Sequence, residues 1–474
     1  MSKLSLNQYS GCRGHRIAII GTGVAGLASA YHLQDRLADK GISLTLFEQA
    51  SKIGGHAETI FVNEGELSIP IDIGFMVFNT ITYPYYSDFL EKLGIENVPT
   101  SMSLSVTDWH KRFFYNSLSI TRGFFPRLRD WFDIRRYELL LEIKKFHSRS
   151  LTALANDKLA DMTLSEYLAT QRICKFAKNY YVKPMTGAIW SAQTSLMDDF
   201  PAEMLINFLY NHGMLGYHTQ FIWRTIKGGS FQYTEKLKQL FKDQIKTNTK
   251  IIKLKETAEG IVVISERGEE GLFKGVIVAT HADDALKLVA SAPSQAKERE
   301  ALALFDYQTN DVYLHSSPLF MPPLKKIWSS WNILLHETKA AYRNLEKNIA
   351  KLPSPYNHSS WYSPNPLRPS NSFHYYINKL QPLVSYGAKE DYFVSLNPPI
   401  IPSKTHYKTR YKHLRLTVRS KQAQKILNAP HRTNKFLHYA GSYLGYGFHE
   451  DGFVAGRRAA LRLSEVLAGE LSMA

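Results

Sequence analysis

The stretch Arg16-Ile-Ala-Ile-Ile-Gly-Thr-Gly-Val-Ala-Gly26 joins a short apolar run to three closely spaced glycines. The run Ile17 to Ile20 is β-branched and apolar, which predicts a strand buried on both faces of a parallel sheet. Gly21 permits a tight turn, and Gly23 lets the backbone approach a phosphate. Gly26 lets the following helix lie close to the strand. The stretch therefore predicts a strand, a phosphate-binding turn and a helix.

The segment after the turn predicts a helix from residue 25 to about residue 37, because apolar residues recur on one side of it. Val24 and Ala25 stand at its start and are predicted to line the phosphate site. The free N–H groups and the positive dipole end of a helix favour an anion at this position. We therefore expect the helix to begin at a bound pyrophosphate.

A second predicted strand, residues 43–47, ends in Glu48, followed by Gln49. Glu48 lies about 20 residues past the glycines, where a carboxylate accepts hydrogen bonds from ribose hydroxyls and repels a 2′-phosphate. The glycine spacing alone is a weak signal. Strand, helix and acid in the expected order together predict a dinucleotide site that includes both Glu48 and Gln49.

A second glycine motif follows in the run Ser51-Lys-Ile-Gly-Gly-His-Ala-Glu-Thr59. Paired glycines at Gly54 and Gly55 soon after an acid resemble the second fingerprint of the FAD-dependent amine oxidase superfamily. The resemblance implies that the dinucleotide is FAD. The superfamily usually has Arg after the glycines, whereas this chain has His56, and His is not reliably charged near neutral pH. The alternative is an ordinary glycine turn after a strand.

Two further segments resemble the same superfamily. The run Asp72-Ile-Gly-Phe75 resembles the segment that passes beside the flavin, which implies that Asp72, Gly74 and Phe75 contribute to the cofactor site. Ile251 stands in the place whose backbone meets the adenine ring.

The C-terminal part contains an Ala-Gly motif that ends at Gly441. Ser442 replaces the acid that the superfamily usually has next. This departure puts in doubt the contact with the ribityl or pyrophosphate group on that side, although both residues are predicted to lie at the cofactor.

A helix is predicted from 452 to 467, with Asp451 as its N-cap. Gly452 and Phe453 would then lie at the helix terminus that faces the flavin, where the helix dipole favours negative charge. The consecutive residues His449 to Asp451 could suggest a metal site, but neighbours in sequence rarely point at one ion. We therefore expect capping and flavin placement, and no metal.

Within the superfamily, the chain is similar to a bacterial branch of flavoproteins associated with the synthesis of cyclopropane or methyl-branched fatty acids. The matching segments extend over nearly the whole chain. They are Gly74–Asn79, Tyr83-Pro84, Trp190-Ser191, Leu314-His315, Met321-Pro322, Trp328–Asn332, Tyr376–Gln381 and Gly447–Gly452.

The motifs predict an α/β fold with two domains. A Rossmann-like FAD-binding domain of the GR2 type is expected to be discontinuous, from residues 14–80, 225–290 and 430–470. An α+β substrate domain is inserted as residues 81–224 and 291–429. The length of 474 residues and the hydrophobic content of 44% are sufficient for two large cores.

The chain carries 58 basic and 42 acidic residues, a net charge of +16, which indicates an anionic partner. Nucleic acid is not expected, because no nucleic-acid-binding module accompanies the charge. Cations crowd the stretch 404–425, and rings alternate with cations in 123–137. Either could hold the protein at an anionic membrane, since each basic residue near such a surface contributes about 1 kcal/mol. The alternative is an ordinary solvated basic face.

The chain has two cysteines, Cys12 and Cys174, which suits a reducing compartment. Neither stands near the C-terminal element where some amine oxidases attach flavin, so FAD is expected to be non-covalent. The first residues lack the apolar core of a signal peptide, and no apolar run is long enough to span a bilayer. We expect a cytoplasmic protein, with attachment to the inner face of the membrane as an open alternative.

The expected chemistry is transfer of a hydride from a substrate C–H bond to the flavin. Many amine oxidases have a Lys at the start of a substrate-domain strand, but the corresponding strand here, predicted at 311–315 after Asn310, has none. This departure weakens the expectation of an amine substrate, and the resemblance to the fatty-acid branch implies an unsaturated or branched fatty-acyl substrate, which is dehydrogenated, isomerised or saturated. His315, Tyr376 and His449 are candidates for orienting groups or bases. The alternatives are a flavin amine oxidase and a non-catalytic flavin-binding lipid protein.

Overall fold

The computed structural model describes residues 16–37, 41–216, 219, 221–290, 292–336, 371–429 and 435–473. The chain divides into two compact units. Unit 1 comprises Met1–Ala57, Tyr233–Phe305 and Gln422–Ala474, and unit 2 comprises Glu58–Gln232 and Asp306–Lys421. Of the two cysteines, Cys12 lies outside the described residues.

Unit 1 contains a five-stranded parallel sheet. Its strands, in spatial order, are β19 (Leu437–Tyr439), β13 (Gly275–Val278), β1 (Arg16–Ile20), β2 (Ser43–Phe47) and β9 (Ile245–Lys246). The central strand β1 is buried from Ile17 to Ile20, as its continuous apolar run predicts. Parallel strands joined by helices confirm the predicted Rossmann-like arrangement.

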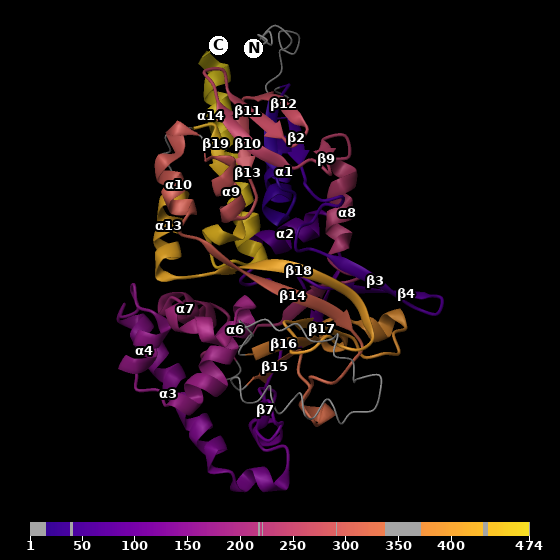
Figure 1. Cartoon of the computed structure of the whole chain (residues 1–474), viewed down its shortest axis with the longest axis vertical. Coiled ribbons are helices and arrows are strands. Elements are labelled where there is room, and N and C mark those ends of the chain that lie inside the picture. Colours follow the sequence, from indigo (N-terminus) through magenta and orange to yellow (C-terminus); the bar gives the residue numbers. More distant parts are fainter. Residues whose placement is uncertain are drawn as a thin grey trace. The chain divides into compact units, whose positions relative to one another are not determined.

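Two helices of unit 1 pack side by side, α1 (Val24–Leu37) and α14 (His449–Met473) (Figure 1). Small residues allow their close approach, since a Cβ on Gly456 would lie closer than 3.0 Å to the carbonyl oxygen of Ala25. The hydroxyl of Ser29 donates to the Gly456 carbonyl at 3.1 Å across the same contact. The other elements of this part are β10 (Ile251–Glu256), β11 (Ile261–Ser265), β12 (Gly268–Phe273), α9 (Ala282–Leu288) and α10 (Ala296–Leu302). Most of α8 (Phe231–Leu240) and of α13 (Val418–Asn428) also belongs to unit 1, whose segments begin at Tyr233 and Gln422.

The prediction that the C-terminal helix begins after an Asp451 N-cap is wrong. The helix begins at His449, and Asp451 lies in its first turn. The Asp451 carboxylate still accepts the N–H of Phe448 at 2.9 Å, so it satisfies a donor at the helix start from within the turn.

Unit 2 is built on a seven-stranded mixed sheet. In spatial order its strands are β18 (Thr405–Arg415), β14 (Asp306–His315), β17 (Phe393–Leu396), β16 (Asn371–Tyr376), β15 (Trp331–Leu335), β6 (Leu104–Asp108) and β7 (Phe114–Asn116). All pairs are antiparallel except β15 with β6. Strand β14 begins five residues before the predicted start at 311, because β18 pairs with it from Asp306 onward.

The helices of unit 2 are α2 (Pro84–Lys92), α3 (Ile134–Ala155), α4 (Leu164–Thr170), α5 (Lys175–Ala177), α6 (Lys183–Trp190), α7 (Ala202–Asn211) and α12 (Ile377–Leu380). Two small antiparallel pairs complete it, β3 (Thr59–Glu64) with β4 (Leu67–Asp72) and β5 (Asn97–Thr100) with β8 (Trp223–Ile226). A mainly antiparallel sheet with helices in separate segments of the chain is an α+β arrangement.

The unit boundaries differ from the predicted domain limits. Residues 58–80 and 225–232, which the motifs place in the FAD domain, lie in unit 2. The physical reason is a buried cluster around Asp72, whose carboxylate accepts hydrogen bonds from Thr59, Ser230 and Gln381, all within unit 2. Sequence motifs report local loop geometry and carry no information on this long-range pairing.

No helix within the described part of the chain is long and apolar enough to cross a membrane.

Candidate cofactor site

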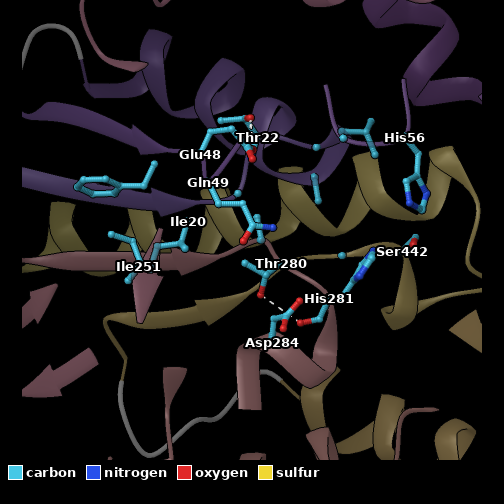
Figure 2. Close-up of a pocket in the computed structure, with 18 of the residues that line it drawn as sticks. Ile20, Thr22, Glu48, Gln49, His56, Ile251, Thr280, His281, Asp284 and Ser442 are labelled. Atoms are coloured by element: carbon cyan, nitrogen blue, oxygen red, sulfur yellow. Dashed lines mark hydrogen bonds between the residues drawn. The ribbon is translucent and has the colours of Figure 1, made fainter. Parts of the chain in front are cut away.

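Unit 1 contains a cavity of about 610 Å³ at the carboxyl end of β1 and the start of α1 (Figure 2). This volume lies within the usual range for cofactor and ligand pockets. The predicted residues that line the cavity are Gly21, Gly23, Val24, Ala25, Glu48, Gln49, Gly54, Gly55, His56, Ile251, Gly441, Ser442 and His449. Segments far apart in sequence therefore converge on one cavity.

The three glycines of the first motif serve different purposes. Gly21 has a φ of +98°, and a Cβ there would lie 2.7 Å from the carbonyl oxygen of Ala279. A Cβ on Gly26 would lie closer than 3.0 Å to the Gly21 carbonyl oxygen, so Gly26 packs α1 on the turn and does not line the cavity. A Cβ on Gly23 would meet no protein atom within 4 Å. Gly23 is therefore free of packing constraint and open toward whatever fills the cavity.

Glu48 is fixed by the loop that it faces. Its carboxylate accepts the N–H of Thr22 at 3.0 Å, the Thr22 hydroxyl at 2.5 Å and the N–H of Ala50 at 2.9 Å. Figure 2 shows Glu48 directly beside Thr22, with Gln49 next to it at the cavity. The remaining lone pairs can accept hydrogen bonds from ribose hydroxyls, whereas the negative charge disfavours a 2′-phosphate on that ribose.

The second glycine motif lies against the first. The N–H of Gly54 donates to the carbonyl of Thr22 at 3.0 Å, and a Cβ on Gly55 would lie 3.0 Å from the Cα of Gly23. Both glycines have positive φ, +115° and +59°. His56 lines the cavity, with its ring centroid 5.7 Å from that of His281. The run is thus part of the cavity wall as well as a turn.

Helix α14 begins at the cavity, since His449 lines it, but Gly452 and Phe453 do not. Gly452 packs on α1, because a Cβ there would lie 2.7 Å from Cγ1 of Val24. Phe453 is buried with its ring 5.7 Å from that of His32. The two predicted cofactor residues therefore position α14 against α1.

Asp72, Gly74 and Phe75 lie in unit 2. Asp72 is buried, and burial raises its pKa to about 6, although Thr59 and Ser230 donate hydrogen bonds to it. The Phe75 ring packs 5.4 Å from that of Tyr86.

His315 takes part in a buried hydrogen-bond chain across the unit 2 sheet. The N–H of Ser317 donates to Nδ1 of His315 at 3.1 Å, so the proton of the neutral ring lies on Nε2, 2.7 Å from Oγ of Ser395. Burial lowers the pKa of His315 to about 3, which keeps the ring neutral. Both ring nitrogens are therefore engaged.

The hydrogen-bond network continues from Ser395 to the neighbouring strand β16. The Ser395 hydroxyl lies 2.7 Å from Nδ1 of His374, whose Nε2 lies 2.8 Å from Oγ of Ser372. Ser372 in turn lies 3.0 Å from Nε2 of His336. Burial also lowers the pKa of His374. Sequence reasoning missed these partners, and the only available signal was the alternation of Ser372 and His374 on one strand face.

Tyr376 donates its hydroxyl to Asp391 at 2.5 Å, and burial raises the pKa of this tyrosine, so it stays protonated. Its ring belongs to a buried cluster with Met321, Trp328 and Phe393. Tyr376 is thus a packed hydrogen-bond donor and not a base.

Of the three catalytic candidates, His315 and Tyr376 lie in unit 2, whereas His449 lies in unit 1 and lines its cavity. Its Nε2 lies 2.9 Å from the hydroxyl of Tyr233. Burial lowers the pKa of His449 to about 3, so the ring is neutral near pH 7.

Replacing His449 by glutamine is expected to flatten the dependence of stability on pH. A buried neutral histidine stabilises the fold above its unfolded pKa of 6.5, and this contribution is lost as pH falls toward the folded value of about 3. In this window the unfolded state binds one more proton at His449, so the free energy of unfolding changes by about 1.4 kcal/mol per pH unit. Urea unfolding of the flavin-free protein at several pH values measures the slope. Parallel profiles for the two proteins would contradict a buried neutral His449.

Several cavity residues were not predicted from sequence, among them Thr22, Thr280, His281 and Asp284, which Figure 2 labels. His281, Asp283 and Asp284 bring possible metal-ligand atoms within 4.8 Å of one another. Asp284 forms an ion pair with Lys287 at 2.8 Å, so this group already has a cation. Within the part that the structure describes, His449 to Asp451 do not form a group of this kind.

Replacing Glu48 by glutamine is expected to weaken FAD binding about ten- to a hundredfold, because charge-assisted hydrogen bonds to the ribose and to Thr22 are lost. Glu270→Gln is the matched control, since Glu270 pairs with Lys246 at 2.9 Å and does not line the cavity. Titration of the flavin-free proteins with FAD measures both affinities. Equal losses in the two variants would show that the effect is not local to the cavity.

Comparison with known proteins connects this geometry to a family. Residues 24–464 match the family model described as flavin containing amine oxidoreductase. The chain belongs to this family. The family description names a flavin, and the α/β fold agrees with membership.

Three similar proteins illustrate the range of this flavin oxidoreductase family. An L-amino-acid oxidase of Siganus canaliculatus is 22% identical over 315 residues, 62% of this chain and 55% of that protein. The chain thus matches about half the length of this curated relative. Cyclohexylamine oxidase from Brevibacterium oxydans IH-35A has the same fold, with a TM-score of 0.63 and 14% identity over 96% of this chain and 100% of that one. A fatty acid isomerase from P. acnes has a TM-score of 0.61 and 12% identity over 94% and 98%.

Proposed function

We propose that this flavoprotein holds FAD non-covalently in the unit 1 cavity and acts on an unsaturated or branched fatty-acyl chain. The observation that carries the cofactor assignment is the convergence of Gly23, Glu48 and the paired glycines on one cavity. An open backbone position for a pyrophosphate and a fixed carboxylate for a ribose fit an adenine dinucleotide. When bound, FAD supplies an acceptor for a hydride.

The cavity residues bind and orient the cofactor. Val24 and Ala25 at the start of α1, and His449 at the start of α14, line the cavity, so two positive helix ends favour negative charge there. Tyr233 fixes the His449 ring at 2.9 Å. Among the residues that the structure describes, no cysteine lines the cavity, and Cys174 is a free cysteine in unit 2, which supports non-covalent attachment.

The residues of unit 2 favour an apolar substrate over an amine. Strand β14 has ten residues and none is lysine, so the group that many amine oxidases place on this strand is missing. Asn310 stands in β14 and donates to the carbonyl of Ser191 at 2.7 Å. His315 and Tyr376 are both neutral and buried. The fold likeness to a fatty acid isomerase agrees with a lipid substrate and leaves dehydrogenation, isomerisation and saturation as the candidate reactions.

A flavin amine oxidase is the second candidate, because the similarity to an L-amino-acid oxidase extends over 62% of the chain. The two candidates differ in the bond that is oxidised, a C–C bond of an acyl chain or a C–N bond of an amine. Release of peroxide from amino acids or polyamines would favour the amine oxidase.

Anaerobic reduction of the purified yellow protein tests the proposal. We expect fatty acids or phospholipids with unsaturated or branched chains to bleach the flavin absorbance, or to be isomerised by the reduced protein, while amines do neither. Saturated straight-chain lipid is the matched control substrate. Bleaching by amines alone would overturn the lipid assignment, and a flavin that no substrate reduces would indicate a non-catalytic lipid protein. Whole-cell fatty-acid profiles with and without the gene provide the second readout.

A further inference from the structure

One end of unit 2 presents large apolar side chains to solvent. We call it the apolar–basic tip; it comprises residues 118–141, from the end of β7 through the helical turns Ile120–Phe124 and Leu128–Phe132 into α3. In Figure 1 it forms the purple helical end below α3 and β7. Its exposed apolar side chains are Leu118, Ile120, Leu128, Trp131, Phe132, Ile134, Tyr137 and Leu141. Leu128, Phe132 and Ile134 are 87%, 90% and 78% exposed, which is unusual for neighbouring large apolar residues.

The tip is held in this conformation by a buried ion cluster. Asp130 is buried and accepts hydrogen bonds from the guanidinium groups of Arg127, at 2.7 Å, and Arg136, at 3.2 Å. Arg136 is fully buried and also donates to the carbonyls of Phe114 and Phe124. Burial lowers the pKa of Arg136. These buried polar contacts hold the tip in one conformation, so the exposed apolar side chains belong to an ordered structure.

Aromatic stacking adds to the framework. The Phe125 ring stacks on Trp131 with 4.4 Å between centroids and lies 5.0 Å from Tyr137. Part of the turn backbone is internally paired, since the N–H of Asp130 donates to the Arg127 carbonyl and the N–H of Asp133 donates to the Asp130 carbonyl. Backbone groups that are already satisfied can approach an apolar medium at low cost.

The exposed charge of the tip is positive. Residues 118–141 contain five arginines and three acidic residues, Asp130, Asp133 and the exposed Glu138. Asp130 is buried beneath the tip, and Asp133 accepts the N–H of Arg135 and pairs with its guanidinium at 2.8 Å. Arg122 and Arg129 stand exposed among the apolar side chains. Apolar residues mixed with cations match the two layers of an anionic bilayer surface, the acyl boundary and the phosphate groups.

The second basic stretch, 404–425, has a different role. Strand β18 is the edge of the unit 2 sheet, where cations prevent pairing with other chains. Its two arginines are paired within unit 2, Arg410 with Asp311 at 2.7 Å and Arg415 with Asp199 and Asp306. In α13, Lys421 pairs with Glu203. Among the described residues, none of the exposed large apolar side chains lies in 404–425, so this stretch lacks the apolar surface of the tip.

We propose that the apolar–basic tip docks the protein on a membrane that contains anionic phospholipid. Leu128, Phe132 and Ile134 enter the boundary between headgroups and acyl chains, and Arg122 and Arg129 contact the lipid phosphates. A second copy of this chain is disfavoured as the occupant, because two tips carry the same positive charge. The proposal is independent of the reaction, since docking requires neither substrate nor turnover.

Flotation of the flavin-loaded protein with vesicles, without substrate, tests the proposal. We expect binding to vesicles of phosphatidylcholine with phosphatidylglycerol and much weaker binding to phosphatidylcholine alone. The combined change Leu128→Asp, Phe132→Asp and Ile134→Asp should reduce binding at least about tenfold. The pair Arg122→Gln and Arg129→Gln should reduce binding to the anionic vesicles and leave the weak binding to phosphatidylcholine unchanged.

Val384→Asp is the matched control, because Val384 is 75% exposed in unit 2 but lies outside the tip. This variant should bind like the unchanged protein, and retained flavin absorbance should confirm that all variants are folded. Absence of wild-type binding, or equal binding by the triple variant, would overturn the proposal. A dimer that the triple change dissociates, together with no vesicle binding, would assign the tip to a second copy instead.

Discussion

Gly26→Ala should abolish flavin retention and lower the free energy of unfolding by about 2–3 kcal/mol. The added methyl group would lie closer than 3.0 Å to the carbonyl oxygen of Gly21. That turn cannot give way easily, because the N–H of Gly21 donates to the carbonyl of Phe47 at 2.8 Å and anchors it to the neighbouring strand. Helix α1 would have to move away from β1, which opens the cavity wall that α1 provides.

Gly23→Ala separates the effect on the fold from the effect on the ligand. A methyl group at Gly23 would meet no protein atom within 4 Å, so the melting temperature of the flavin-free protein should stay unchanged. FAD affinity should nevertheless fall, because the methyl group occupies the space that a pyrophosphate needs. Melting curves and FAD titrations of both variants measure the two effects. Unchanged FAD affinity in Gly23→Ala would show that the phosphate lies elsewhere.

Asp72→Ala should destabilise unit 2 by about 3 kcal/mol or more, because it leaves several buried donors without an acceptor. Ser230 donates through its N–H and its hydroxyl, each at 2.8 Å, and Thr59 donates at 2.5 Å. Gln381 donates its amide at 3.1 Å. Asp72→Asn is the milder control, because it keeps the volume and one acceptor oxygen. Urea unfolding followed by tryptophan fluorescence measures the difference, and equal stabilities of the Ala and Asn variants would contradict this role.

The Asp72 carboxylate also makes the free energy of unfolding depend on pH. Burial raises the folded pKa of Asp72 to about 6 from an ordinary value of 3.8. A raised folded pKa stabilises the fold at low pH, and the contribution is lost as pH rises from about 4 to about 6, a total of about 3 kcal/mol. The stability difference between the unchanged protein and Asp72→Asn should therefore shift in favour of the variant over this window. A constant difference would show that the pKa is not raised.

Local motifs predicted several residues that the structure brings together at one cavity. Gly21, Glu48 and the Gly54-Gly55 pair occupy positions that depend on backbone turns and on short segments, and all line the cavity. Such positions can be recognised from sequence because the chemistry of phosphate and ribose contact restricts residue type at fixed spacing. Gly26, Gly452 and Phe453 belong to the same motifs but pack helices α1 and α14, which spacing alone does not distinguish from ligand contact.

The sequence did not predict which distant strands pair with one another or which of their residues lie opposite. His315, Ser395 and His374 meet because β14, β17 and β16 are neighbours, with Ser395 directly opposite His374. The predicted FAD domain includes residues 58–80, whereas these residues lie in unit 2, because the contacts of Asp72 join segments more than a hundred residues apart. Likewise, the rings and cations of 123–137 were visible in the sequence, but their exposure became apparent only in the structure.

The flavin content of the purified protein tests the central claim most directly. Heating or acid should release the flavin, and chromatography should identify it as FAD in equimolar amount with the chain. The protein left behind should be colourless and should regain its absorbance when FAD is added, except in Gly26→Ala. A colourless purified protein that does not take up FAD, or a flavin that stays attached after denaturation, would contradict a non-covalent FAD site in the unit 1 cavity.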